Sequence, residues 1–217
     1  MDVFEDDTLF ESEHFLLRPV ELTDAADLLR CYGDEKAVAR MNADNCTSAF
    51  LLKSLPEMAD CIRFWRSDGE RAQYIRFAVV DKADGRAVGT CELFPREKLG
   101  PLKRVGLLRV DLMSAYETEK ALTELFGLFH REFYEQLRYL MTKAPAAATL
   151  RRELLRAWGY AAVRSRKVIP FDGYWFRAGR AQNLPYGCGG LACVLCEIED
   201  CPGCQMEDGF CGGSESS

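Results

Sequence analysis

Cysteine pairs near the end of the chain are its most distinctive group of ligand-forming residues. Cys193 and Cys196 form one pair, Cys201 and Cys204 form another, and four residues separate the pairs. In a reducing compartment, paired thiols are better explained by metal binding than by disulfides, and four thiolates suit tetrahedral Zn²⁺. The spacer is too short for a zinc ribbon, so it favours a clamped loop or a small thiolate cluster. The alternative is a redox-active or unliganded tail.

A change in composition near residue 180 divides the chain of 217 residues. Residues 1–180 have the apolar content of a packed domain, and residues 181–217 form an acidic tail rich in cysteine and glycine. Six acids in this tail account for the whole net charge of −6, so residues 1–180 are neutral overall. A domain without excess positive charge argues against nucleic acid as a partner.

The hydropathy pattern argues against a membrane protein. No run approaches the ~18 consecutive apolar residues of a transmembrane helix, and the N-terminal segment is acidic where a signal peptide would be basic and then apolar. These features predict a cytoplasmic protein with no membrane partner.

Hydrophobic periodicity predicts an alternation of strands and helices over the first 180 residues. Strands are expected at 14–20, 74–80, 86–94, 105–112, 138–143, 161–169 and 173–178, with a loop at 95–103. Helices are expected at 25–32, within 47–66 with a kink or break at Pro56, at 116–137, and from Thr149 to Gly159.

The connections between these elements indicate the fold class. Asp84-Gly85 lies between two β-rich runs and favours a hairpin, whereas the strand-helix-strand segments need crossovers. The expectation is a mixed α/β (α+β) domain whose six- to seven-stranded sheet is mostly antiparallel and is flanked by helices.

Three local sequences in this element order resemble the GNAT superfamily of acetyl-CoA-dependent N-acyltransferases. The resemblance covers about residues 10–178 and is nearest to the branch of ribosomal-protein N-terminal acetyltransferases. The sequences are Leu17-Arg18-Pro19 followed by Thr23-Asp24-Ala25, then Gly85-Arg86-Ala87-Val88-Gly89-Thr90, and finally Glu153-Leu154-Leu155-Arg156-Ala157-Trp158-Gly159-Tyr160.

The resemblance implies where acetyl-CoA would bind. In the family the cofactor lies in a V-shaped opening between the fourth and fifth strands, which correspond here to 105–112 and 138–143. Main-chain groups of the fourth strand pair with the pantetheine arm, and amides at the start of the next helix hold the pyrophosphate. The corresponding positions are Val110, Asp111, Leu112, Glu117, Thr118, Glu119, Lys120, Ala121 and Leu122.

The chain departs from the family at two places. Both glycines of the pyrophosphate loop are absent, and Glu117 and Glu119 place negative charge where phosphates would dock unless Lys120 compensates. In the late helix, Leu155 stands where the family often has a tyrosine that protonates the leaving thiolate. The cofactor is therefore expected either to bind differently and weakly or not to bind.

For an enzyme of this type, the resemblance implies direct attack of an amine on the thioester in a ternary complex. A general base must take the amine proton, and an N–H donor must stabilise the oxyanion. Glu92 and Asp111 are the candidate bases, and the main chain of 110–112 is the candidate oxyanion donor. Tyr116 is a candidate for cofactor contact or for the acid. For each of these side chains a purely structural role is the competing interpretation.

Three functions remain open on the sequence alone. The leading one is an N-acetyltransferase that uses acetyl-CoA to modify a primary amine, in a small molecule or at a protein N-terminus. The second is a catalytically degenerate scaffold or binding protein with a metal-binding or redox-active tail. The third treats the tail itself as a metal store or redox switch. A homodimer through the late strands is consistent with the resemblance.

Overall fold

The computed structural model describes residues 9–44, 46, 50–69, 74–99, 102–133, 139–163, 166 and 168–178. The predicted tail, with its candidate zinc ligands Cys193, Cys196, Cys201 and Cys204, lies outside the described residues.

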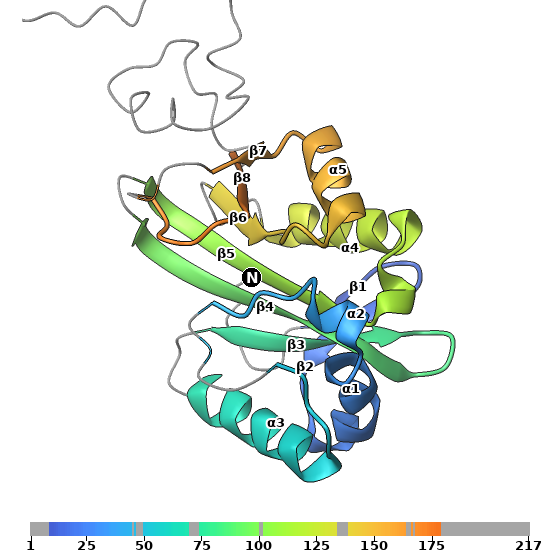
Figure 1. Cartoon of the computed structure of the whole chain (residues 1–217). Coiled ribbons are helices and arrows are strands. Elements are labelled where there is room, and N and C mark those ends of the chain that lie inside the picture. Colours follow the sequence, from blue (N-terminus) through green and yellow to red (C-terminus); the bar gives the residue numbers. More distant parts are fainter. Residues whose placement is uncertain are drawn as a thin grey trace, which may run out of the picture.

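One mixed sheet organises the described part of the chain, as predicted (Figure 1). Every neighbouring pair of strands is antiparallel except β5 and β6, which are parallel. The strands, in spatial order, are β1 (Phe10–Glu11), β2 (Phe15–Pro19), β3 (Ile75–Asp81), β4 (Arg86–Leu99), β5 (Leu102–Leu112), β6 (Tyr139–Lys143), β8 (Tyr174–Ala178) and β7 (Ala161–Ala162).

Helices cover both faces of the sheet (Figure 1). On one face, α1 (Ala25–Tyr32) and α3 (Leu55–Gly69) pack on Ala78 and Val80 of β3, beside the short α2 (Glu35–Val38). On the other face, α4 (Glu119–Phe133) and α5 (Thr149–Ala157) cover Phe77 and Val79. Alternate residues of β3 thus serve two separate cores, as the period of two in a strand requires.

The predicted hairpin and the predicted long helix both form, and the helix is shorter at its start. The β3–β4 turn reverses at Gly85, whose φ of 73° favours glycine. The helix begins at Glu119, because Ser114–Tyr116 form a 3₁₀ turn instead. Four apolar side chains that recur at steps of three and four along this helix are fully buried against the sheet: Leu122, Leu125, Phe126 and Phe129.

Three predicted boundaries are wrong. The expected loop at 95–103 is mostly strand, because β4 and β5 pair along nearly their whole length and override the loop preference of Pro95. The helix expected within 47–66 begins only at Leu55, and Pro56 lies in its first turn, where a missing N–H breaks no helical bond. Of the residues that the structure describes within the strand expected at 161–169, only Ala161–Ala162 form a strand.

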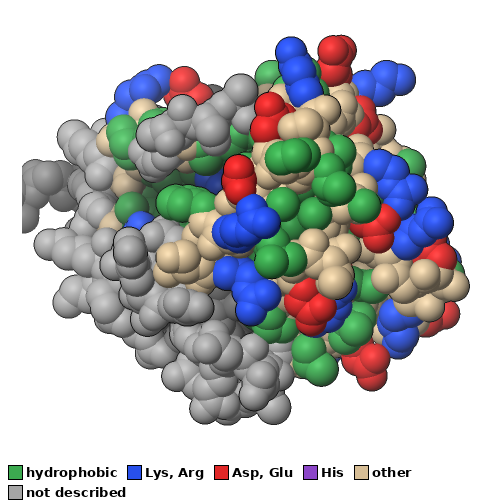
Figure 2. All heavy atoms as spheres, turned by 90° about the horizontal axis from the view of Figure 1, so that it is seen from below, with side chains coloured by type: hydrophobic (Ala, Val, Ile, Leu, Met, Phe, Trp, Pro, Cys, Tyr) green, Lys and Arg blue, Asp and Glu red, His purple; other side chains and the backbone are tan. Residues whose placement is uncertain are grey.

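Figure 2 shows the molecule from below the view of Figure 1. On the described part of this face, Lys and Arg side chains are interspersed with Asp and Glu side chains and with apolar ones, so the described residues there do not form a patch of one charge that would attract a polyanion. In the described residues, no helix is long and apolar enough to span a bilayer.

Candidate acetyl-transfer site

A row of buried charges crosses the middle of the sheet. Arg76 of β3, Glu92 of β4 and Arg109 of β5 are register neighbours, so their side chains lie side by side on the face covered by α1 and α3. Glu92 forms an ion pair with Arg76, and its Oε2 lies 3.8 Å from Nη1 of Arg109. The exposed fractions of the three side chains are only 4%, 1% and 10%. Arg76 also stacks on the Trp65 ring, with 3.9 Å from Cζ to the ring centroid.

A second polar row lies directly behind the first. Thr90 and Asp111 are register neighbours, and the Tyr32 hydroxyl of α1 lies over both. This hydroxyl lies 2.7 Å from Thr90 Oγ1, donates to Asp111 Oδ2 at 3.1 Å, and accepts a bond from Arg76 at 3.3 Å. Burial raises the pKa of Tyr32 well above its ordinary value, so this hydroxyl stays protonated as a donor. Asp111 is fully buried by these contacts.

A cavity of about 530 Å³ opens in front of the charged row. Its floor is the sheet, with Arg76, Glu92 and Arg109, and α3 forms one side. This volume and a mixture of aromatic and charged walls are typical of small-molecule sites. Its aromatic lining comes from several elements: Phe50, Phe64, Trp65, Tyr74, Phe94 and Tyr174.

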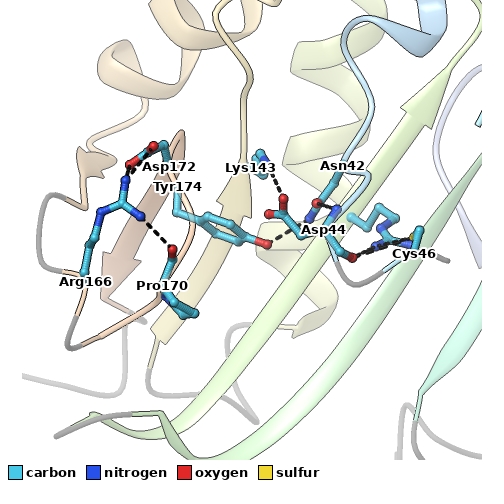
Figure 3. A network of polar contacts seen from close by, with 9 residues as sticks. Asn42, Asp44, Cys46, Lys143, Arg166, Pro170, Asp172 and Tyr174 are labelled. Carbon is cyan, nitrogen blue, oxygen red and sulfur yellow. Dashed lines mark hydrogen bonds and ion pairs between the residues drawn. The ribbon is translucent and has the colours of Figure 1, made fainter.

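The segment after α2 brings a carboxylate to the cavity that sequence reasoning missed. Asp44 Oδ1 accepts a bond of 2.6 Å from Lys143 Nζ at the end of β6 (Figure 3). Arg109 Nη2 lies 3.4 Å from the Asp44 main-chain oxygen and 3.8 Å from Cys46 Sγ. Asp44 therefore joins β5 to β6. No local motif marks this residue, because its partners lie 65 and 99 positions away.

A tyrosine on β8 completes this side of the cavity. Tyr174 is the register partner of Lys143, and its hydroxyl accepts a bond of 2.9 Å from Asn42 Nδ2 (Figure 3). Burial, opposed by the bond from Asn42 and helped by the Asp44 charge, raises the pKa of Tyr174 to about 12. The phenol is therefore a protonated donor at neutral pH.

The parallel strands β5 and β6 part beside the cavity. Their pairing runs from Val105 with Tyr139 to Leu108 with Thr142, and β5 continues to Leu112 paired with β4 only. Arg151 of α5 enters this opening, where Nη1 donates to the Val110 carbonyl at 2.8 Å and Nη2 forms an ion pair with Glu117. Only 1% of the Arg151 side chain is exposed. The predicted position of the pantetheine arm thus holds a guanidinium.

Thr118 caps the start of α4 in the predicted pyrophosphate loop. Its main-chain carbonyl accepts a hydrogen bond of 2.9 Å from the Leu122 amide, and its Oγ1 accepts one of 3.3 Å from the Ala121 amide. The amides of Glu119 and Lys120 are the first of α4 and point out of the helix start. Lys120 is expected from the sequence to offset the negative charge of this loop. In the structure, Arg151 forms the ion pair with Glu117 instead, and Lys120 Nζ lies 3.2 Å from His14 Nε2.

The three predicted catalytic side chains occupy different places. Glu92 lines the cavity, and Asp111 lies behind Tyr32 on the same face of the sheet. Tyr116 is on the opposite side, where it packs with Phe15 and its hydroxyl donates to Asp81 at 2.7 Å. Burial and, after it, this hydrogen bond raise the pKa of Tyr116 to about 12. The structure therefore brings Glu92 and Asp111 together but not Tyr116.

The described residues contain no cluster of three or more His, Cys, Asp or Glu side chains that could hold a metal ion. Cys91, next to Glu92, is fully buried, and burial raises the pKa of its thiol.

Comparison with known proteins identifies a family. Residues 14–149 match the family model described as "Acetyltransferase (GNAT) domain". No curated protein matches the sequence.

Solved structures of similar fold include several acetyltransferases. A ribosomal-protein-S5-alanine acetyltransferase from Vibrio fischeri is 16% identical, with a TM-score of 0.54 over 80% of this chain and 98% of the other. RimL, a ribosomal L7/L12 alpha-N-protein acetyltransferase solved with coenzyme A, is 10% identical, with a TM-score of 0.57 over 81% and 100%. The microcin C7 self-immunity acetyltransferase MccE, solved with acetyl-CoA and AMP, is 9% identical, with a TM-score of 0.58 over 77% and 93%.

Proposed function

Because the chain belongs to the family of GNAT acetyltransferase domains, we propose that it transfers an acetyl group from acetyl-CoA to a primary amine. The observation that carries this proposal is the adjacency of two sites. The opening between β5 and β6 begins beyond Leu108 and Thr142. Arg109 and the end of β6, which border this opening, also contact Asp44 at the cavity. A thioester placed in the opening would therefore face an amine placed in the cavity.

The reaction is a direct displacement within a ternary complex. The amine nitrogen attacks the thioester carbonyl carbon, a C–N bond forms, and the carbonyl oxygen gains negative charge. Main-chain N–H groups of residues 110–112, on the part of β5 that has no pairing with β6, are the donors for this oxyanion. Collapse of the intermediate breaks the C–S bond, and the thiolate takes a proton.

The arrangement favours Asp44 as the base and Tyr174 as the acid. Arg76 holds Glu92 in a close ion pair, which stabilises its charged form and suits it to positioning the two arginines. Asp111 is separated from the cavity by Tyr32. Asp44, by contrast, lines the cavity, and its Oδ2 has no hydrogen-bond partner among the described residues. Tyr174, beside Asp44, carries the proton that the thiolate needs.

The deciding experiment measures cofactor binding and turnover separately. Calorimetric titration of the purified chain with acetyl-CoA and with CoA is expected to give saturable binding. An amine panel is then assayed for acetylated product by mass spectrometry, a readout that the ten cysteines do not disturb. Asp44→Asn and Tyr174→Phe should lower kcat by about 10²-fold while leaving acetyl-CoA binding unchanged. Arg63→Gln, in an exposed ion pair on α3, is the matched control.

Arg151 favours a second candidate, a GNAT-like scaffold without catalysis. Its side chain occupies the opening where the pantetheine arm would lie. Absence of acetyl-CoA binding by the native chain, with binding gained when Arg151 is shortened to Ala, would support this candidate.

A further inference from the structure

Four buried polar atoms of cavity-lining residues have no hydrogen-bond partner among the described residues. Two of them, Arg76 Nε and Glu92 Oε2, belong to the close Arg76–Glu92 ion pair, and the other two are Nε of Arg109, a donor, and Oδ2 of Asp44, an acceptor. Both residues line the cavity, and the Arg109 side chain is nine-tenths buried. Leaving such groups unpaired is unfavourable, because each has lost its hydrogen bonds to water without gaining one in the protein. The cost is recovered when a ligand supplies the missing partners.

Arg109 is held by long contacts only. Its guanidinium lies 3.8 Å from Glu92 Oε2, 3.4 Å from the Asp44 main-chain oxygen and 3.8 Å from Cys46 Sγ. Glu92 already forms a much closer ion pair with Arg76. A carboxylate accepts charge-assisted bonds from a guanidinium at about 2.7 to 2.9 Å. Arg109 therefore has the charge and the unused donor for a ligand anion.

Asp44 offers the opposite charge next to Arg109. Lys143 occupies its Oδ1, and its other oxygen is the unpartnered one. Because Arg109 Nη2 reaches the main chain of Asp44, an acceptor for an amine and a donor for an anion lie on adjacent parts of one wall. This pairing is complementary to a molecule whose amine and acid groups are only a few bonds apart.

The remaining walls indicate the body of that molecule. Phe50, Phe64 and Trp65 come from the α3 side, and Tyr74, Phe94 and Tyr174 from the sheet. Aromatic rings pack favourably against other rings. A cavity of about 530 Å³ has room for one ring-bearing molecule of amino-acid size rather than for a folded chain.

We propose that the acceptor of this enzyme is a free aromatic amino acid, whose ammonium binds Asp44 and whose carboxylate binds Arg109 within the aromatic cavity. This inference names the acceptor of the proposed acetyl transfer, and the acetylation of the bound amine depends on that proposed function. The ammonium gives one proton to Asp44 before attack, and the second proton, which the nitrogen releases as the amide forms, replaces the one that Tyr174 gives to the thiolate. The carboxylate stays on Arg109 and undergoes no reaction.

Binding of the acceptor is tested without the cofactor. The native chain is titrated calorimetrically with L-phenylalanine, with phenethylamine, which lacks the carboxylate, and with 3-phenylpropionate, which lacks the amine. L-Tyrosine and L-tryptophan are titrated in parallel. Each compound that lacks one charge is expected to bind at least about tenfold more weakly than the amino acid, which corresponds to ~1.4 kcal/mol. Equal or tighter binding of phenethylamine, or no binding of any aromatic amino acid, would overturn the proposal.

Charge-specific variants assign each group. Arg109→Gln should remove the preference for L-phenylalanine over phenethylamine, and Asp44→Asn should remove the preference over 3-phenylpropionate. Asp84→Asn, which removes a carboxylate from an exposed ion pair with Arg86 at the β3–β4 turn, outside the cavity lining, should change neither ratio. A ratio unchanged in both variants would sink the assignment, and thermal unfolding checks that each variant is folded.

The titrations separate the two proposals. Amino-acid binding without acetyl-CoA binding would refute the acetyl transfer and retain the amino-acid site. Acetyl-CoA binding and turnover of another amine, with no amino-acid binding, would retain the transfer and refute the acceptor.

Discussion

Arg151 joins the Val110 carbonyl of β5 to the Glu117 carboxylate that precedes α4. Both side chains are almost fully buried, so the positive charge of one is neutralised by the negative charge of the other. The loop carboxylate that would otherwise repel a pyrophosphate is thereby turned inward. Cofactor binding must then compete with this pair.

Glu117→Gln should strengthen acetyl-CoA binding. The substitution removes a negative charge from the pyrophosphate loop and releases the Arg151 guanidinium toward the incoming anion. We expect about a tenfold lower Kd, equivalent to ~1.4 kcal/mol, measured by calorimetry. Arg151→Gln should have the opposite effect, because it leaves the buried Glu117 charge unpaired.

The matched control is Glu119→Gln. This residue carries the same charge in the same loop, but it is exposed and solvent screens it. A change of about twofold or less is expected. Equal effects of the two variants would mean that only net loop charge matters. Weaker binding by Glu117→Gln would mean that the ion pair organises the site.

Local patterns are sufficient to predict most elements, whereas Glu92 is a candidate base through the family resemblance rather than through a local pattern. The hairpin at Gly85 and the apolar stripe of α4 are set by residues near one another in sequence. Pairing between long strands is not local, which is why the predicted loop at 95–103 became part of a β4–β5 hairpin.

The residues that sequence reasoning missed share one property, namely that distant elements bring them together. Asp44 meets Lys143 from β6, and Arg151 meets Val110 from β5, 99 and 41 positions away. Neither contact leaves a periodic or spaced signal in the chain. No local pattern marks Tyr174 as a proton donor, because its raised pKa comes from burial in the folded protein.

Gly89→Ala should be strongly destabilising. A Cβ at this position would overlap the Asp111 main-chain oxygen and would lie 2.9 Å from Leu112 Cα, both on the neighbouring strand. The backbone would have to move, at a cost of about 2 to 4 kcal/mol in the free energy of unfolding. Gly127→Ala in α4 is the control, since its Cβ meets nothing within 4 Å and should stabilise the helix by about 0.5 to 1 kcal/mol. Urea unfolding measures both, and a loss below ~1 kcal/mol for Gly89→Ala would contradict the clash.

His130 should make the fold less stable in mild acid. Burial, together with the Arg177 charge, lowers the pKa of His130 to about 4, and Nε2 lies 2.8 Å from the Tyr160 hydroxyl. The unfolded chain takes up this proton near pH 6.5 and the folded chain only near pH 4, so the stability due to neutral His130 is complete above pH 6.5 and declines down to about pH 4. We expect a loss of about 1 to 2 kcal/mol after allowance for partial exposure. In His130→Gln, the free energy of unfolding should fall less steeply as the pH decreases through this window than it does in the native chain. An identical pH dependence in the two proteins would exclude His130 as the source.

The cysteine pairs of residues 193–204 should bind zinc. Protein purified under reducing conditions is expected to carry about one Zn²⁺ per chain by elemental analysis. Cys196→Ser removes one thiolate and should lower this ratio, whereas Cys61→Ser, on α3, should not. Freshly purified protein without zinc or iron would refute metal binding by the tail.

Glu92→Gln separates a structural from a catalytic role for this carboxylate. The substitution leaves Arg76 buried without its ion-pair partner, and breaking such a pair costs about 3 to 5 kcal/mol. We therefore expect a large drop in the urea midpoint, partly restored in Glu92→Gln/Arg76→Gln, where neither charge remains. Asp60→Asn, in an exposed pair, should stay within about 0.5 kcal/mol of the native chain. If Glu92→Gln instead unfolds at the native midpoint and loses only turnover, Glu92 rather than Asp44 is the base.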